Sequence, residues 1–163
     1  MSLKVFISYS GADHEIVEGL NRLVKEQGAT PQLAESVTSP GAILENKIKD
    51  MISKSDLIIA VLTVAGTRAQ WVNWELGAAS ALKKRIVPML EDGAKLPPCL
   101  EGKEYIKFTK ANIDVAFRAV SGFIQRYVTK KRLTDLLALT LMVIGLVVFL
   151  FALVMWLFPR KKR

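Results

Sequence analysis

The sequence predicts a doubly wound α/β domain with a parallel sheet, followed by a single C-terminal transmembrane helix. Three observations carry this prediction. Short apolar runs alternate with stretches of helical periodicity between residues 4 and 127, which is typical of strands that alternate with helices. The run at residues 56–63 is apolar throughout its centre, as a strand covered on both faces must be. Residues 136–158 contain no charged side chain.

The first half of the chain supplies two strands and two helices. The apolar, β-rich run Lys4–Ser8 predicts a buried strand. Asp13 is placed to cap the helix that follows, which ends at Gly28. Pro31–Ala34 predicts a short second strand, and a second helix follows the break at Pro40–Gly41. Its apolar face consists of Ile43, Leu44, Ile48, Met51 and Ile52.

The second half supplies three strands and two helices. Asp56–Thr63 predicts the central strand, Arg85–Leu90 a further strand, and Tyr105–Phe108 a short edge strand. One helix is predicted from about Trp71 to Lys84. The other covers Asn112–Tyr127, where the pattern is amphipathic, and runs almost directly into the membrane segment.

Fold and composition together limit where a site can lie and what it can use. In a doubly wound sheet, ligands bind outside the carboxyl ends of the strands, so we expect functional residues in the loops after Ser8, Ala34 and Thr63. Cys99 is the only cysteine and His14 the only histidine. A disulfide within the chain, a Cys/His zinc site and a Ser-His-Asp triad are therefore not expected, and no metal site is predicted.

The uncharged segment is long enough to span a bilayer. As a helix, residues 136–158 extend about 34 Å, against a hydrocarbon core of about 30 Å. Lys130–Arg132 and Arg160–Arg163 flank it, and Trp156 and Phe158 lie at its far end, where aromatic side chains suit the headgroup boundary. The alternative is a buried helix of a soluble core. The predicted organisation is a domain at 1–129, a basic juxtamembrane segment at 130–135, a transmembrane helix at 136–158 and a basic tail at 159–163.

Charge and the N-terminal sequence suggest the cellular setting. Most of the formal net charge of +8 comes from the two clusters that flank the apolar segment, which suits membrane lipid as a partner. Basic residues do not interleave with aromatic ones in a stripe, so nucleic-acid binding is not expected. The N-terminus lacks a signal-peptide pattern. We therefore expect a tail-anchored, single-pass protein whose N-terminal domain is cytoplasmic.

Four motifs follow one another along the first half of the chain. They are VFISYSGAD at residues 5–13, the break at residues 39–41, DLIIAVLT at residues 56–63 and WVNWEL at residues 71–76. Together they resemble Toll/interleukin-1 receptor (TIR) domains, specifically the bacterial kind. The resemblance covers about residues 3–128. It implies a flavodoxin-like fold with a five-stranded parallel sheet, and homotypic association with other TIR domains.

Many TIR domains cleave NAD⁺ between nicotinamide and ribose, and the family's catalytic glutamate corresponds to Glu75. The resemblance therefore implies NAD⁺ as a substrate, with no prosthetic group. Departure of nicotinamide builds oxocarbenium character on the ribose, which one adjacent carboxylate can stabilise without a general acid. The alternative is an acidic residue in the first turn of a helix, placed there for the macrodipole. Trp71, one turn earlier, lines the nicotinamide–ribose pocket by resemblance; the alternative is core packing.

Two loops complete the site that the resemblance implies. Ser10 and Gly11 match the loop after the first strand, where the family contacts NAD⁺; small residues there let backbone N–H groups approach phosphate or ribose. Ser39 and Gly41 match the loop that the family uses for self-association and cofactor access. Ordinary turn chemistry at Pro-Gly is the alternative for this second pair.

The predicted function is that of a membrane-anchored NAD⁺ nucleosidase, a hydrolase or cyclase, which self-association activates and which serves in anti-phage defence. One residue departs from the family pattern: Ala34 stands where many catalytic TIR domains carry an acid, although Glu35 is adjacent. Alternatives are a non-enzymatic module that recruits TIR partners to a membrane, and a membrane helix that is itself the effector. Residues 74–79, followed by 85–90, also resemble nucleoside deoxyribosyltransferases, which makes such an enzyme a further alternative.

Overall fold

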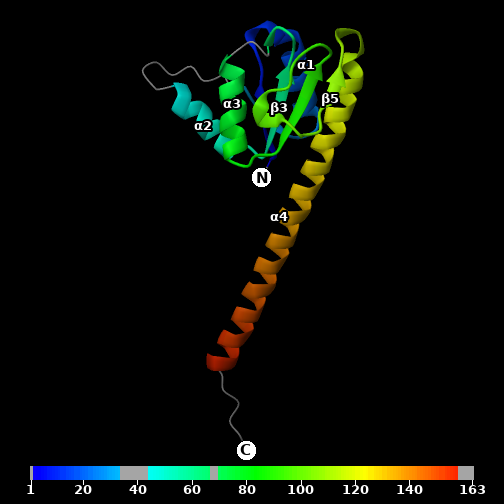
Figure 1. Ribbon diagram of the computed structural model, residues 1–163. Coiled ribbons are helices and arrows are strands. Elements are labelled where there is room, and N and C mark those ends of the chain that lie inside the picture. Colours follow the sequence, from blue (N-terminus) through cyan, green and yellow to red (C-terminus); the bar gives the residue numbers. More distant parts are fainter. Residues whose placement is uncertain (1, 34–43, 67–69, 158–163) are drawn as a thin grey trace, which may run out of the picture. The chain divides into compact units, whose positions relative to one another are not determined.

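The computed structural model describes residues 2–33, 44–66 and 70–157. The chain divides into two units, Ser2–Val128 and Thr129–Arg163. The first contains a parallel sheet of five strands in the order β2-β1-β3-β4-β5, which confirms the predicted α/β fold (Figure 1). The strands are β1 (Lys4–Ser8), β2 (Thr30–Leu33), β3 (Leu57–Leu62), β4 (Ile86–Glu91) and β5 (Ile106–Phe108).

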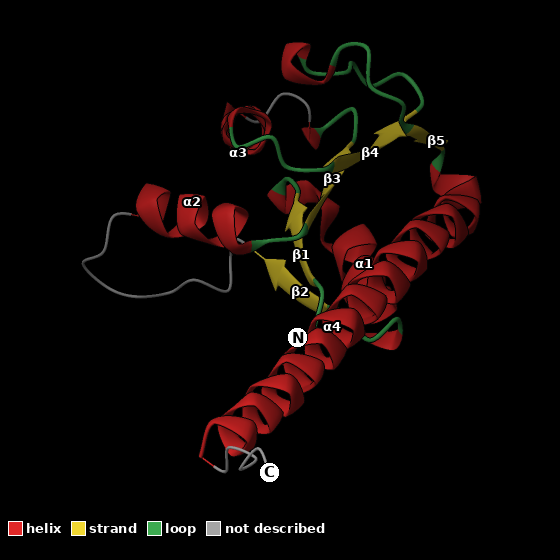
Figure 2. Ribbon diagram, turned by 90° about the horizontal axis from the view of Figure 1, so that it is seen from below, coloured by secondary structure: helices red, strands yellow, loops and turns green. Residues whose placement is uncertain are grey.

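Helices cover both faces of this sheet (Figure 2). α1 and the first turns of α4 pack on one face, while α2 and α3 pack on the other. The helices are α1 (His14–Glu26), α2 (Leu44–Lys54), α3 (Gln70–Ala81) and α4 (Ile113–Leu157). Short 3₁₀ turns are η1 (Gly11–Asp13), η4 (Pro98–Leu100) and η5 (Lys110–Asn112).

Strand β3 shows why the centre of the sheet is apolar without interruption. All its residues are buried. The odd-numbered ones join the core beneath α1 and α4, and the even-numbered ones join the core beneath α2 and α3. Because successive side chains of a strand point to opposite faces, a strand that is covered on both sides has no position for a polar residue. The apolar run at residues 56–63 is thus accounted for.

The start of α1 differs from the prediction. Asp13 occupies the N-cap position but makes no side-chain cap hydrogen bond, and its side chain is buried. Ser10 instead caps the preceding turn η1, where its hydroxyl accepts the N–H of Ala12. Asp13 therefore lies at the predicted cap position, but the prediction that its side chain caps the helix is wrong. The side chain points inward, toward Thr63 at the end of β3.

The last helix is longer than predicted. Instead of ending at Tyr127, α4 continues without a break to Leu157. Residues 128–135 contain neither proline nor glycine. Lysine, arginine and leucine, which fill half of this stretch, are good helix formers, so nothing in it ends the helix.

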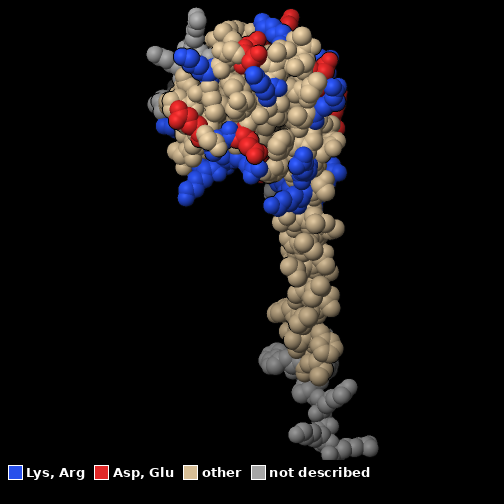
Figure 3. Space-filling model, turned by 45° about the vertical axis from the view of Figure 1, so that its right-hand side comes forward, with Lys and Arg blue, Asp and Glu red and all other residues tan. Residues whose placement is uncertain are grey.

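The second unit is described to Leu157 and consists of the C-terminal part of α4. This helix is long and apolar enough to cross a membrane, and none of its most apolar stretch is buried. Figure 3 shows that the helix below the charged segment at residues 130–135 has a surface free of Lys, Arg, Asp and Glu. Thr134 and Thr140 donate their hydroxyl hydrogens to carbonyls one turn earlier, at 3.0 and 2.9 Å, which satisfies these polar groups within the helix. The side chains of Trp156 and Phe158 lie outside the described part.

A tight contact joins the ends of β1 and β3. The N–H of Gly66 donates to Oγ1 of Thr63 at 2.8 Å. A Cβ atom added at Gly66 would lie 2.7 Å from Oδ2 of Asp13 and 2.9 Å from Oγ1 of Thr63. Both neighbours are buried, so they have little room to move. Gly77, inside α3, has nothing within 4 Å of the same added atom.

We expect the two glycines to respond in opposite directions to alanine. Gly66→Ala should lower the free energy of unfolding by about 1–3 kcal/mol, because the added methyl group overpacks a buried contact. Gly77→Ala should raise it by about 0.5–1 kcal/mol, because alanine is the better residue inside a helix. Urea unfolding of the full chain in detergent, followed by circular dichroism, measures both. Equal effects of the two substitutions would contradict this account of the contact.

Candidate active site

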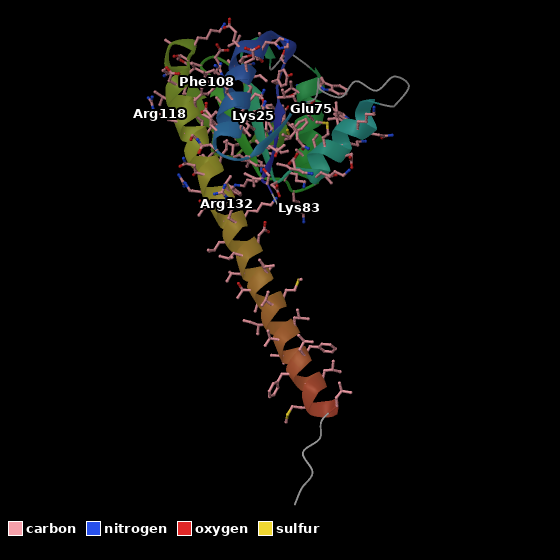
Figure 4. The ribbon with its side chains drawn as sticks, turned by 180° about the vertical axis from the view of Figure 1, so that it is seen from behind. Lys25, Glu75, Lys83, Phe108, Arg118 and Arg132 are labelled. Atoms are coloured by element: carbon pink, nitrogen blue, oxygen red, sulfur yellow. The ribbon has the colours of Figure 1, made fainter. Side chains whose placement is uncertain are left out.

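Glu75 is a buried carboxylate at the interface between α3 and the sheet (Figure 4). Its side chain is 1% exposed, and it shares the inward face of the helix with Val72, Leu76 and Ala79. The sequence analysis predicted that Glu75 lies in the first turn of this helix. Since α3 begins at Gln70, the first turn contains no acidic residue, and that placement is wrong. The macrodipole, whose effect falls off within one turn, does not explain a glutamate here.

Ser8 holds this carboxylate from the end of strand β1. Its hydroxyl donates to Oε2 of Glu75 at 2.5 Å, across 67 residues of sequence. Ser8 is the last residue of β1 and is completely buried. It lies two residues after Phe6, which belongs to the core beneath α3, so the alternation of the strand directs both side chains to the same face. The sequence analysis predicted functional residues in the loop after Ser8 but did not identify Ser8 itself as one. The alternation of side chains along the strand could have indicated that Ser8 faces α3.

The surroundings of Glu75 bring its titration close to neutral pH. Burial raises the pKa of this carboxyl from 4.5 to about 7, and hydrogen bonds from Ser8 and Trp71 lower it by less. A carboxylate at the carboxyl edge of a parallel sheet that is half ionised near pH 7 is suited to acid, base or electrostatic roles. Perturbed pKa values of this kind cluster at functional sites.

Trp71 borders the same carboxylate from one turn earlier. Its side chain is 39% exposed, so it is not a core residue. It stacks on Trp74 with ring centroids 5.2 Å apart and planes inclined by 24°. Its side chain is also a hydrogen-bond partner of Glu75. An exposed aromatic surface therefore lies directly beside a buried carboxylate.

The remaining predicted residues divide into two groups. Ser10 and Gly11 follow Ser8 at the same edge of the sheet, and Gly11 is exposed with open space around it. Ser10 has a local structural task as the cap of η1. Ser39 and Gly41 lie outside the described residues. The structure thus brings Trp71 and Ser10 to the edge where Glu75 lies, and their part in substrate binding stays a prediction.

A second buried carboxylate lies close by. Asp13 is 6% exposed, and its Oδ2 atom has no hydrogen-bond partner. Burial raises its pKa, and hydrogen bonds from the Thr63 side chain and the Ser10 backbone act in the opposite direction. Within the described ranges, no three His, Cys, Asp or Glu side chains gather closely enough to hold a metal ion.

The family model of the TIR domain matches residues 5–120. The chain belongs to the TIR domain family. This confirms the family that the motifs at residues 5–13, 56–63 and 71–76 indicated. A search of curated proteins found no match to the chain.

Solved structures show how widely this fold is used. The TIR domain of the Toll-related receptor TRR-2 from Hydra magnipapillata is 21% identical, with a TM-score of 0.63 over 74% of this chain and 97% of that one. The CMP N-glycosidase BcmB of Clostridium botulinum is 24% identical, with a TM-score of 0.56 over 72% and 97%. A 2-deoxyribosyltransferase from Bacillus psychrosaccharolyticus is 15% identical, with a TM-score of 0.55 over 69% and 89%. These likenesses show a shared fold.

The buried glutamate makes the stability of this TIR domain depend on pH. Folding raises the pKa of Glu75 from 4.5 to about 7, so the folded state favours the protonated form of this side chain. The free energy of unfolding therefore falls as the pH rises from about 4.5 to about 7. Glu75→Gln keeps an acceptor for Ser8 and removes the ionisation. We expect the free energy of unfolding of this variant to exceed that of the original chain by up to about 3 kcal/mol at pH 8, and to differ little from it at pH 4.

Urea unfolding at the two pH values measures this difference. Glu18→Gln, at an exposed position of α1, is the matched control and should change stability little at either pH. A Glu75→Gln variant that is less stable than the original chain at pH 8 would contradict the account of a carboxylate destabilised by burial.

Proposed function

We propose that this TIR domain cleaves NAD⁺ at the bond between nicotinamide and ribose, with Glu75 as the catalytic carboxylate. The observation that supports this most directly is the buried Glu75, held by Ser8 beside the exposed Trp71. This group lies at the carboxyl ends of β1 and β3, where the strand order reverses. Doubly wound folds bind their ligands at that point.

The chemistry needs only one carboxylate. The bond from C1′ of the ribose to the nicotinamide nitrogen breaks, and its electron pair leaves with nicotinamide, which becomes neutral. Positive charge builds on the ribose as this bond breaks, and ionised Glu75 stabilises it in a site with little water. Hydrolysis is completed when water adds to C1′ and loses a proton. A nucleophile within the same molecule gives the cyclic product instead.

Glu75 acts in its ionised form in this proposal, which gives the reaction a pH dependence. Because burial raises the pKa of Glu75 to about 7, the rate should increase with pH through neutrality and level off above it. Ser8 stabilises the ionised form through its hydrogen bond. Ser8→Ala should therefore move the midpoint of the rate profile to higher pH.

The decisive experiment measures loss of NAD⁺ and release of nicotinamide by the full chain, crowded in vesicles. We expect turnover that rises with protein density, at least about 100-fold less turnover in Glu75→Gln, and unchanged turnover in Glu18→Gln. The Ser8→Ala profile, measured from pH 5 to 9, separates positioning of Glu75 from simple loss of fold. Intact NAD⁺ under crowding would contradict the proposed enzyme and favour the module that recruits TIR partners.

A nucleoside or nucleotide substrate is the second candidate. The observation that favours it is the shared fold with a CMP N-glycosidase and a 2-deoxyribosyltransferase, both of which are named for chemistry at an N-glycosidic bond. CMP and deoxynucleosides are therefore assayed beside NAD⁺ with the same variants. Base release from these compounds, with NAD⁺ left intact, would move the proposal to this class while keeping Glu75 in its role.

The setting that we propose is a membrane, with α4 as the anchor and the TIR domain in the cytoplasm. The apolar surface of the second unit, with its internally bonded threonines, supports this arrangement. Association with other TIR domains would then take place in the plane of the membrane, where local concentration is high. The resemblance to bacterial TIR proteins is what supports a role in anti-phage defence.

A charge in the middle of the apolar segment tests the anchor. Val147→Arg should move a large part of the chain out of the membrane fraction after alkaline extraction, because arginine at the centre of a spanning helix costs about 2.5–3.5 kcal/mol. Val115→Arg, at an exposed position of the same helix inside the TIR domain, is the matched control and should leave the chain membrane-bound. Equal extraction of the two variants would contradict anchoring by this segment.

A further inference from the structure

A basic cavity lies at the opposite edge of the sheet from Glu75. It has a volume of about 390 Å³ and is built at the amino ends of β4 and β5. Its polar lining consists of Lys84, Arg85, Lys103, Glu104 and Tyr105, and Phe123 of α4 lines its apolar side. Basic side chains gather at the lower edge of the globular unit in Figure 3, where the strands of Figure 1 begin.

Two of the three cations of this cavity, Lys84 and Arg85, contact neighbouring elements of the fold. Nζ of Lys84 donates to the carbonyls of Ser53 and Ser55, the latter at 2.9 Å. The guanidinium of Arg85 lies 5.9 Å from the ring centroid of Tyr127 on α4. Both Arg85 and Lys103 are exposed, so their charged groups face solvent. Three basic residues against the single carboxylate of Glu104 leave the cavity positive.

Two acidic residues near this edge have hydrogen-bond or ion-pair partners outside the cavity. Asp50 pairs with Lys54 at 2.6 Å, within α2. Asp56 accepts the backbone N–H of Lys4 at 2.8 Å. Arg85 and Lys103, the two exposed cations of the cavity, are the side chains that can meet an anion from outside.

The chain itself limits how far this cavity can lie from a bilayer. Arg85 contacts Tyr127, which precedes Val128, the last residue of the globular unit. Leu136 begins the uncharged segment, and along a helix it lies about 12 Å beyond Val128. The headgroup layer fills about 5–8 Å of that distance. Only a short stretch of chain therefore separates Arg85 and its contact Tyr127 from the segment that we propose to span the bilayer.

We propose that this cavity docks the anionic headgroups of the membrane that anchors α4, with Arg85 and Lys103 as the phosphate-binding side chains. The inference rests on the proposed anchoring. Guanidinium and ammonium groups bind phosphate oxygens through charge-assisted hydrogen bonds, and basic residues near the cytoplasmic leaflet attract anionic lipid. Docking at the amino edge turns the carboxyl edge, with Glu75 and Trp71, toward the aqueous side. Substrate and neighbouring TIR domains then have free access to it.

Amide hydrogen exchange of the full chain in vesicles tests this docking. We compare phosphatidylcholine vesicles with vesicles that also contain phosphatidylglycerol, at low and high salt. Exchange at residues 83–87 and 101–106 should slow by about threefold or more in the anionic vesicles, and high salt should reverse this. Arg85→Gln with Lys103→Gln should abolish the slowing. The matched pair Lys95→Gln with Lys110→Gln removes two exposed charges after β4 and β5, at the other edge, and should preserve it.

Three other outcomes would contradict the proposed docking of lipid headgroups. Equal exchange in both vesicle types contradicts it, as does slowing that survives in the Arg85 and Lys103 variant. Inorganic phosphate added to phosphatidylcholine vesicles should have no effect; slowing there would assign the cavity to a soluble anion instead. Alkaline extraction of the same vesicles separates this proposal from the one before it. A chain that is extracted contradicts the anchor, whereas a retained chain without slowing contradicts only the docking.

Discussion

The hydrogen bond from Ser8 to Glu75 is the interaction on which the site depends. It joins the end of β1 to the middle of α3, two elements far apart in sequence. A buried carboxylate without a donor would be costly, because burial removes its hydration. The serine offsets part of that cost, and the rest remains as a raised pKa. The TIR fold thus maintains a destabilised group at the edge of its sheet, as functional sites commonly do.

The core can accommodate this group because most of the buried polar residues lie where the strands end. Of the five buried polar side chains in the described part, Ser8, Asp13, Thr63 and Glu75 lie at the carboxyl edge, and the fifth, Ser55, lies just before β3 at the amino edge. The interior of the sheet between α1 and α3 is apolar, and packing there fixes the strands without any polar contribution. Rigid strands then set the positions of the hydroxyl and carboxyl groups that follow them. Packing and chemistry are therefore divided along the length of each strand.

Much of this could be predicted from the sequence, because it depends on local patterns. The apolar run of β3 indicated a doubly covered central strand, and the motif around Trp71 indicated both the family and Glu75. The partner of Glu75 could not be identified in the same way, because alternation places Ser8 on a face without saying which residue of a distant helix meets it. The inward turn of Asp13 was missed for a similar reason, since a cap position normally predicts an exposed carboxylate.

A basic cavity lies at one edge of the sheet and the buried carboxylates of Glu75 and Asp13 lie at the other, and parallel topology produces this separation. Helices in such a fold end where strands begin, so lysines that suit the negative end of a helix dipole collect with Arg85 at the amino edge. The same topology sends the carboxyl ends of β1 and β3 to the edge where Glu75 lies. Arg85 at this basic edge contacts Tyr127 of α4, which continues beyond it to Leu157. One strand order thus places the basic cavity and the buried carboxylate of Glu75 at opposite ends of the strands.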